Sequence, residues 1–155
     1  MWRLARAADD DSVVEMCQQL YREDPGPEPV PEAHARNTLD ALRAEPARGR
    51  VLVLELEGRV RGYAVLVSFW SNELGGEICT IDELYVQPSA RGKGWGSTLV
   101  RAAARDRAIW PRDPVAVELE VTPANARARA LYERLGLEPR RNASMRLRLS
   151  HTVSG

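Results

Sequence analysis

Residues 81–99 read IDELYVQPSARGKGWGSTL, a strand-like segment joined to a helix-like segment by a glycine-rich turn. The apolar segment ends at Val86, and three glycines then alternate with larger residues up to Gly96. Because glycine has no Cβ, such a turn lets the backbone approach a ligand closely and aims several N–H groups the same way. The following helix adds the partial positive charge of its N-terminus. The stretch therefore predicts an anion site that suits a pyrophosphate.

Two familiar phosphate motifs do not match this turn. The dinucleotide fingerprint needs Gly-x-Gly-x-x-Gly, and here the third glycine comes one residue early. The Walker loop needs Gly-Lys-Ser/Thr, whereas Lys93 is followed by Gly94. A glycine-rich turn that binds nothing is the alternative that the glycines leave open.

Outward from the turn, apolar spacing predicts the other elements. Towards the C-terminus we expect a helix from Gly96 that Pro111 stops, a strand over 115–121, and a helix that starts at 123–125 and ends at Gly136. Alternating apolar residues at 145, 147 and 149 then suggest closing strands around a polar turn at 140–143.

Towards the N-terminus we expect a strand over 2–6, a helix that begins at 9–12, and a second helix over 32–44. Four prolines and a glycine make residues 24–31 irregular. A hairpin of strands 51–56 and 60–69 follows, and then the strand over 78–86. The order β-α-α-β-β-β-α-β-α-β predicts an α+β fold with a mixed, largely antiparallel central sheet flanked by helices.

Composition limits the classes of protein. The 155 residues suit one domain, for which we expect residues 1–150, with a flexible tail at 151–155. Basic and acidic residues number 22 each, and this zero net charge argues against nucleic-acid binding. No signal peptide and no membrane-length apolar run is apparent, so we expect a cytoplasmic protein without a membrane partner.

Two segments together resemble a known family. The residues around the turn resemble the acetyl-CoA-binding motif of the GNAT superfamily of N-acetyltransferases, Gln/Arg-x-x-Gly-x-Gly/Ala, and Arg91, Gly94 and Gly96 fill its three fixed positions. Residues 125–137, NARARALYERLGL, are similar to the later helix motif of that family. The resemblance implies a GNAT-like fold in which the strand before the loop splays from its neighbour at the acetyl-CoA site.

The resemblance also implies which residues bind acetyl-CoA, the acetyl donor. Backbone amides of the loop would hold the pyrophosphate, backbone groups of the preceding strand would pair with the pantetheine arm, and two residues of the later helix would face that arm. In order, these are Arg91, Gly92, Lys93, Gly94, Trp95 and Gly96; Leu84, Tyr85 and Val86; and Asn125 and Tyr132. Trp95 is expected to pack at the helix start, and Asn125 also suits a helix cap.

Amine acetylation needs a base and an acid. A lysine-like amine with a pKa of about 10.4 is neutral in only about one molecule in 2,500 at pH 7. Candidates for the base are Glu77, Asp82 and Glu83, with Asp82 slightly favoured because it matches a glutamate of polyamine acetyltransferases. Strict alternation places Asp82 and Glu83 on opposite faces, and a bulge would swap the assignment. By resemblance, Tyr132 protonates the departing thiolate.

The predicted activity is transfer of acetyl from acetyl-CoA to a primary amine by direct attack in a ternary complex. The alternative is a non-catalytic acyl-CoA-binding or sensory module on the same fold. The acceptor remains open between small amines, polyamines, aminoglycosides, peptide N-termini and protein lysines. No metal is expected, Cys17 and Cys79 lie in no nucleophile motif, and a homodimer is possible because this fold often pairs through edge strands.

Overall fold

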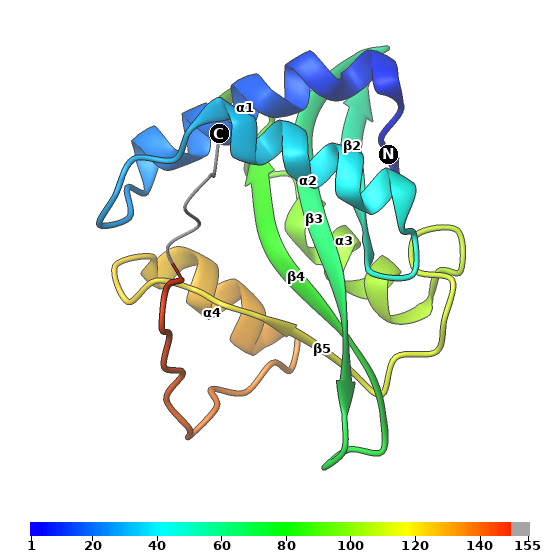
Figure 1. Cartoon of the computed structure of the whole chain (residues 1–155), viewed down its shortest axis with the longest axis vertical. Coiled ribbons are helices and arrows are strands. Elements are labelled where there is room, and N and C mark those ends of the chain that lie inside the picture. Colours follow the sequence, from blue (N-terminus) through cyan, green and yellow to red (C-terminus); the bar gives the residue numbers. More distant parts are fainter. Residues whose placement is uncertain (150–155) are drawn as a thin grey trace.

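The computed structural model describes residues 1–149, which build one five-stranded sheet in the order β1-β2-β3-β4-β5 (Figure 1). The strands are β1 (Trp2–Leu4), β2 (Gly49–Leu56), β3 (Arg59–Ser71), β4 (Gly76–Val86) and β5 (Ala116–Leu119). Neighbouring strands pair antiparallel except β4 and β5, which are parallel. The predicted α+β class with a largely antiparallel sheet is confirmed.

Helices cover both faces of the sheet. On one face lie α1 (Asp10–Glu23) and α2 (Glu32–Ala44), and on the other lies α3 (Trp95–Arg105). The last helix, α4 (Ala126–Arg134), lies beside the β5 side of the sheet (Figure 1). Short 3₁₀ turns at Ala7–Asp9 and Pro88–Ala90 precede α1 and the glycine-rich loop.

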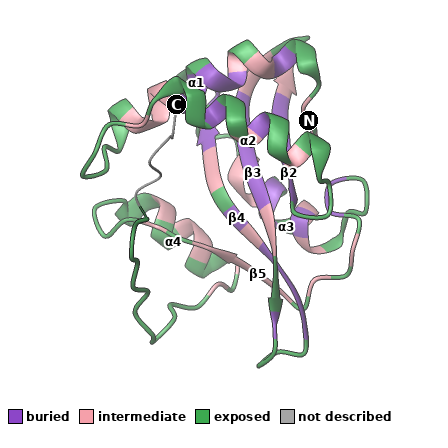
Figure 2. Cartoon of the chain, viewed as in Figure 1, coloured by how far each residue is buried: buried purple, intermediate pink, exposed green. Residues whose placement is uncertain are grey.

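The alternation of side chains along the strands divides the core into two layers, visible as buried segments in Figure 2. On β2, Leu52 and Leu54 face α3, whereas Val51 and Val53 face α1 and α2. All four are at most 7% exposed. Because both faces of β2 are covered, its sequence reads as a continuous apolar run.

A bulge in β4 interrupts this alternation. Leu66 of β3 pairs with Ile81 and Val65 pairs with Glu83, so Asp82 is the additional residue. Ile81 and Leu84 both pack towards α3, and Tyr85 packs towards α1. The bulge therefore places Glu83 and Tyr85 on the α1 and α2 face of the sheet.

The structure differs from the prediction at the end of α3. The helix ends at Arg105 rather than continuing to Pro111. The Asp106 side chain accepts a hydrogen bond from the N–H of Ala108 at 2.9 Å, and this local turn competes with the helix. Ile109 and Trp110 therefore lie in the loop after the helix, and their side chains are buried in the core from there.

The predicted closing strands are wrong. Residues 137–149 contain no strand, and Met145, Leu147 and Leu149 are 73–96% exposed. Apolar alternation shows which side chains share a face, but a strand also needs a backbone partner. This segment is held instead by side chains, through the ion pairs of Arg140 with Glu118 and of Arg148 with Glu28.

None of the helices within residues 1–149 is long and apolar enough to cross a membrane. The expected flexible tail at 151–155 lies outside the described residues.

Candidate active site

The glycine-rich loop has the backbone geometry that its sequence predicts. Gly92 and Gly94 have φ angles of +79° and +80°, in the left-handed region that glycine adopts without strain. Gly94 is the N-cap of α3, so the loop leads directly into the positive end of that helix.

The N–H groups of this loop are open to a ligand. Within residues 1–149, the backbone N–H groups of Gly92, Lys93 and Gly94 have no hydrogen-bond acceptor in the protein. The first N–H groups of α3, from Trp95 onward, lack intrahelical acceptors as in any helix. Several exposed donors therefore converge at one helix N-terminus, which is the arrangement that binds phosphate groups.

The side chain of Arg91 bonds to groups outside the loop, on β4 and α1. Its Nε donates to the carbonyl of Val86 at 2.7 Å, and its Nη2 donates to the Glu23 carboxylate at 2.6 Å. The guanidinium also lies over the Tyr85 ring, 5.3 Å from the ring centroid. Arg91 thus ties the loop to the end of α1, and its pairing with Glu23 lowers the pKa of that carboxyl.

Trp95 packs at the start of α3, as the sequence predicts. Its ring contacts the α3-side core, and its carbonyl accepts a hydrogen bond from the indole Nε1 of Trp2 at 2.9 Å. The indole Nε1 of Trp95 is buried and has no partner within residues 1–149. Lys93, in contrast, is exposed.

The end of β4 has one open edge. Pairing of β4 with β5 stops at Ile81 and Leu119, whereas β4 still pairs with β3 as far as Val86. Leu84 and Val86 therefore lie on the part of β4 that has separated from β5. This is the splay that the resemblance implies, and it leaves backbone groups free beside the loop.

Helix α4 closes the other side of this opening. A Cβ placed on Gly96 would lie 3.4 Å from Leu131 Cδ2 and 3.7 Å from Leu84 Cδ2, so α4, the start of α3 and β4 meet here. Asn125 caps α4, and its side chain accepts the N–H of Ala128 at 3.2 Å. Its predicted contact with the cofactor arm stays a prediction.

Tyr132 lies on the inner side of α4. The residue is half-buried and packs against the α3-side core. Burial raises the pKa of its hydroxyl, so the group is a protonated phenol at neutral pH. This protonation state is the one that an acid needs.

Among the three candidate carboxylates, Glu77 is engaged in structural contacts with neighbouring side chains. It is 8% exposed, accepts a hydrogen bond from Trp110 Nε1 at 2.7 Å and forms an ion pair with Arg112 at 2.7 Å. Its oxygens are therefore occupied at the far end of β4 from the loop. These contacts do not favour Glu77 as the base.

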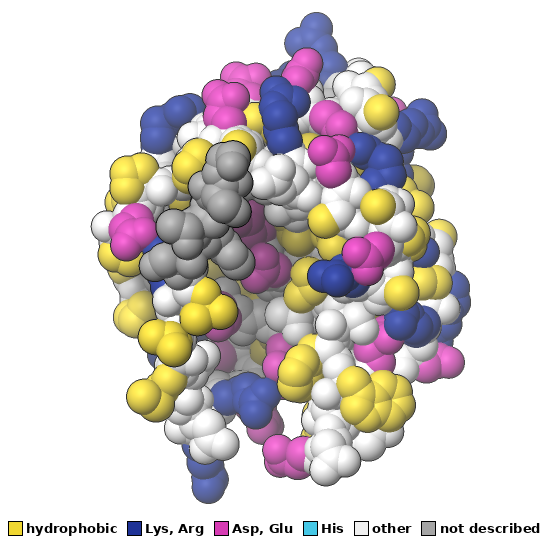
Figure 3. All heavy atoms as spheres, in the orientation of Figure 1, with side chains coloured by type: hydrophobic (Ala, Val, Ile, Leu, Met, Phe, Trp, Pro, Cys, Tyr) yellow, Lys and Arg dark blue, Asp and Glu magenta, His cyan; other side chains and the backbone are white. Residues whose placement is uncertain are grey.

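Asp82 and Glu83 instead line the same pocket, because the bulge turns both towards α1 and α2. The pocket has a volume of about 60 Å³. Its other lining side chains come from α1, α2, β2 and β3, and they are Val13, Cys17, Tyr21, His34, Ala35, Thr38, Leu39, Val51 and Val65. In Figure 3, acidic side chains are visible in the hollow at the middle of the displayed face.

The two carboxylates of this pocket have different surroundings. Glu83 accepts hydrogen bonds from Tyr21 on one oxygen and from Tyr63 on the other, the latter at 2.8 Å. Asp82 has no hydrogen-bond or ion-pair partner within residues 1–149. Although solvent reaches Asp82, lost hydration raises its pKa, as do the negative charges of Glu83 and Glu120, against the opposing charge of Arg146.

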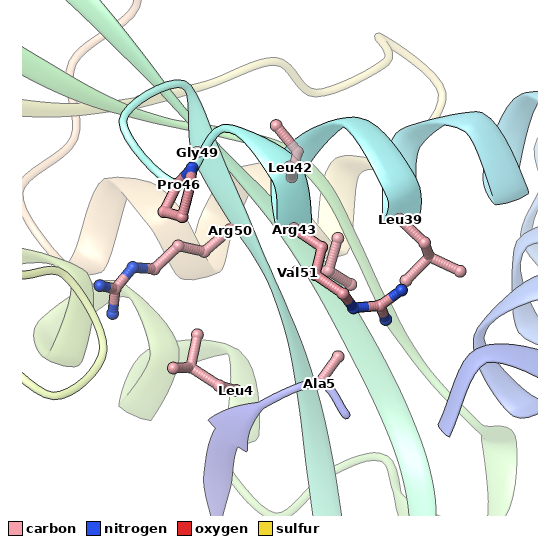
Figure 4. A pocket seen from close by; sticks show the side chains of 9 residues that line it. All are labelled: Leu4, Ala5, Leu39, Leu42, Arg43, Pro46, Gly49, Arg50 and Val51. Atoms are coloured by element: carbon pink, nitrogen blue, oxygen red, sulfur yellow. The ribbon is translucent and has the colours of Figure 1, made fainter. Parts of the chain in front are cut away.

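A larger hollow of about 280 Å³ lies elsewhere, between α2 and the β1–β2 side of the sheet (Figure 4). Its two guanidiniums are already engaged. Arg43 pairs with Asp10 at 2.7 Å, and Arg50 donates to the carbonyls of Ala108 and Ile109. The hollow shares Leu39 and Val51 with the acidic pocket, but its lining includes no residue of the loop and neither of the two carboxylates.

Sequence reasoning missed the side chains that complete the acidic pocket. No sequence pattern assigned a role in the site to Tyr21, Tyr63, Cys17 or His34. Burial raises the pKa of the Cys17 thiol to about 11, which agrees with the absence of a nucleophile motif. No local signal identifies these residues, because the docking of α1 and α2 onto β4 brings them together.

The glycine-rich loop at the start of α3, the open part of β4 and helix α4 meet at one place in the fold. The profile of the acetyltransferase (GNAT) family matches residues 14–137. The chain therefore belongs to the GNAT acetyltransferase family. Within residues 1–149 no group of three or more potential metal-ligating side chains occurs.

Known relatives agree with this family. A streptothricin acetyltransferase of Streptomyces lavendulae is 36% identical over 105 residues, which are 63% of this chain and 49% of that protein. The chain thus matches about half the length of this curated relative.

Solved structures share the fold over almost the whole chain. A possible acetyltransferase from Clostridium difficile 630 has a TM-score of 0.80 at 23% identity, with 97% of this chain and 98% of that chain covered. A ribosomal-protein-alanine N-acetyltransferase from Brucella melitensis biovar Abortus 2308 has a TM-score of 0.71 at 19% identity, with 96% and 99% covered.

Proposed function

We propose that this protein transfers an acetyl group from acetyl-CoA to a primary amine. The observation that carries the proposal is the loop of Gly92 to Gly94, whose N–H groups are free beside the open edge of β4. A pyrophosphate on this loop and an extended arm along β4 would bring a thioester towards the bulge at Asp82. Bound acetyl-CoA supplies an activated acetyl group for attack by a nucleophile.

The acceptor must lose a proton. Because an alkyl ammonium has a pKa of about 10.4, recovery of the neutral amine at pH 7 corresponds to roughly 4–5 kcal/mol. A carboxylate positioned beside the amine removes this proton. Asp82 and Glu83 are the two candidates, and both line a pocket on the face of β4 opposite α3.

The leaving group must gain a proton. As the amine nitrogen bonds to the thioester carbon, the carbon–sulfur bond breaks and its electron pair remains on sulfur. Tyr132 is the group for this step, because its buried phenol keeps its proton at neutral pH. The ammonium loses two protons in all: one passes to the carboxylate before the attack, and the other leaves the nitrogen of the tetrahedral adduct to solvent. The Tyr132 phenol gives its proton to sulfur and regains one from solvent, and the carboxylate then releases its proton, so one proton is released for each acetyl group transferred.

The acceptor is not named by the loop. The curated relative is called a streptothricin acetyltransferase, and streptothricin therefore belongs in any acceptor panel for this chain. The acidic pocket favours acceptors that carry a positive charge, because two of its lining side chains are carboxylates, those of Asp82 and Glu83. Alkyl diamines, lysine-containing peptides and aminoglycosides complete the panel.

Release of free thiol from acetyl-CoA tests the proposal. The protein, acetyl-CoA and each amine are mixed, free thiol is followed with a chromogenic disulfide, and the product is identified by mass spectrometry. We expect amine-dependent thiol release and one N-acetylated product. Tight CoA binding without turnover of any amine would instead support the non-catalytic acyl-CoA-binding module.

A further inference from the structure

The Glu83 carboxylate is fixed by two tyrosines from different elements. Tyr21 of α1 donates to Oε1, and Tyr63 of β3 donates to Oε2 at 2.8 Å. Tyr63 is fully buried and Tyr21 is half-buried. Each oxygen of the Glu83 carboxylate therefore accepts a hydrogen bond, one from a residue of helix α1 and the other from a residue of the sheet.

Asp82 is the neighbouring residue and has no such restraint. It occupies the bulge, lines the same pocket and has no partner within residues 1–149. A free carboxylate can turn towards an amine, whereas a carboxylate held on both oxygens must lose a hydrogen bond to do so. Two adjacent acidic residues thus have unequal freedom.

We propose that Tyr21 and Tyr63 are positioning residues that hold Glu83 as a fixed anion beside Asp82, so that Glu83 orients the charged amine and Asp82 removes its proton. This inference rests on the proposed function. The N–H bond of the bound ammonium breaks, its electron pair stays on nitrogen, and its proton moves to an oxygen of Asp82. Glu83 exchanges no proton in this step.

Other charged and titratable groups lie around Asp82. Glu83 and Glu120 contribute negative charge, and Arg146 of the C-terminal segment contributes positive charge. His34 of α2 and Cys17 of α1 also line the pocket. Burial and the two carboxylates raise the pKa of Asp82, and Glu83 is the nearest of these charges in sequence.

The pH dependence of kcat/KM separates the two carboxylates. Wild-type kcat/KM should fall as the pH decreases through the raised pKa of Asp82. Glu83→Gln removes a like charge, so the acidic limb should move to lower pH, while KM for a diamine rises about tenfold or more. Asp82→Asn should remove the acidic limb together with most of kcat. Glu15→Gln, an exposed change on α1, is the charge control and should change neither quantity.

A double-mutant cycle separates positioning from structural support. Tyr21→Phe keeps the ring and removes only the hydroxyl, so Glu83 loses one restraint, KM should rise several-fold and the acidic limb should move upward. In the Glu83→Gln background the same change should have no further effect, because Tyr21 no longer has a carboxylate to hold. Additive effects in the two backgrounds would overturn the positioning role.

A measurement without turnover keeps the inference separate from the proposed function. The carboxyl carbon of Asp82 is followed by ¹³C NMR, with its signal assigned by Asp82→Asn. We expect its midpoint above that of an aspartate in an unstructured peptide, lower in Glu83→Gln and higher in Tyr21→Phe. A midpoint that neither variant moves would overturn the inference even if amines are acetylated, and so would loss of turnover in Glu83→Gln with retention in Asp82→Asn. Shifts as expected in a protein that acetylates no tested amine would support the Tyr–Glu83–Asp82 arrangement and contradict the proposed function alone.

Discussion

The two sides of β4 present different kinds of chemical group, backbone groups on one side and side chains on the other. On the proposed donor side, the groups available to a ligand are the backbone N–H groups of Gly92 to Gly94 and the free edge near Leu84. On the acceptor side, the side chains of Asp82 and Glu83 face those of α1 and α2. Changes of side chain should therefore matter little on the donor side unless they alter the backbone, whereas on the acceptor side they should alter the chemistry itself.

The largest effect is expected from Asp82→Asn on the acceptor side. Loss of a general base commonly lowers kcat by about 10²- to 10⁴-fold, and the amide keeps the size of the side chain. Steady-state kinetics with a diamine, together with CoA binding by calorimetry, measure the two sides separately. An unchanged kcat would show that another residue or water accepts the proton.

Tyr132→Phe should have the next largest effect. It removes the proton for sulfur while it retains the half-buried ring, so kcat should fall roughly 10- to 100-fold. CoA affinity should remain within about twofold, because the ring still packs on the α3-side core. Calorimetry and turnover on the same preparation check this separation, and undiminished turnover would reject the acid role.

Gly94→Ala tests the backbone character of the donor side. A Cβ at Gly94 has open space, so the change acts through the φ angle of +80°. We expect roughly tenfold weaker CoA binding, because strain of about 1–2 kcal/mol favours another loop conformation.

Gly58→Ala is the matched control for this loop variant. Gly58 has a φ of +71° and equally open surroundings, but it lies in the β2–β3 turn. It should lower stability similarly without weakening CoA binding. Equal losses of CoA affinity in both variants would show that the loop effect is only destabilisation.

The smallest kinetic effect is expected from Glu77→Gln. Its carboxylate pairs with Arg112 and Trp110, so loss of charge should cost about 1–3 kcal/mol of stability. For a domain of this size, the melting temperature should fall by roughly 2–10 °C. The kcat should stay within about twofold, and a large loss of kcat would return Glu77 to the list of candidate bases.

The contrast between the two sides also explains what could be predicted from sequence. The geometry of the loop was predictable because glycine spacing, strand end and helix start are contiguous in the sequence, and because it depends on the backbone. The bulge at Asp82 was only one of two alternatives, since it depends on register with Val65 and Leu66 of β3. Strict alternation would have separated the two carboxylates.

The rest of the acceptor side depends on contacts that local patterns do not encode. Tyr21 and Glu83 are 62 positions apart, and their hydrogen bond exists because α1 docks on β4. The prediction of closing strands near the C-terminus was wrong for a different reason. Alternation at 145, 147 and 149 was a real local pattern, but the segment has no backbone partner in the sheet.

The central claim is that donor and acceptor meet across β4 at one point. Calorimetric affinity for a compound that joins an alkyl amine to the sulfur of CoA through an acetyl bridge tests this most directly. The wild-type protein should bind it at least about tenfold more tightly than CoA, and Glu83→Gln should lose this gain while Gly94→Ala weakens both ligands equally. A compound that binds the wild-type protein no more tightly than CoA would contradict the claim.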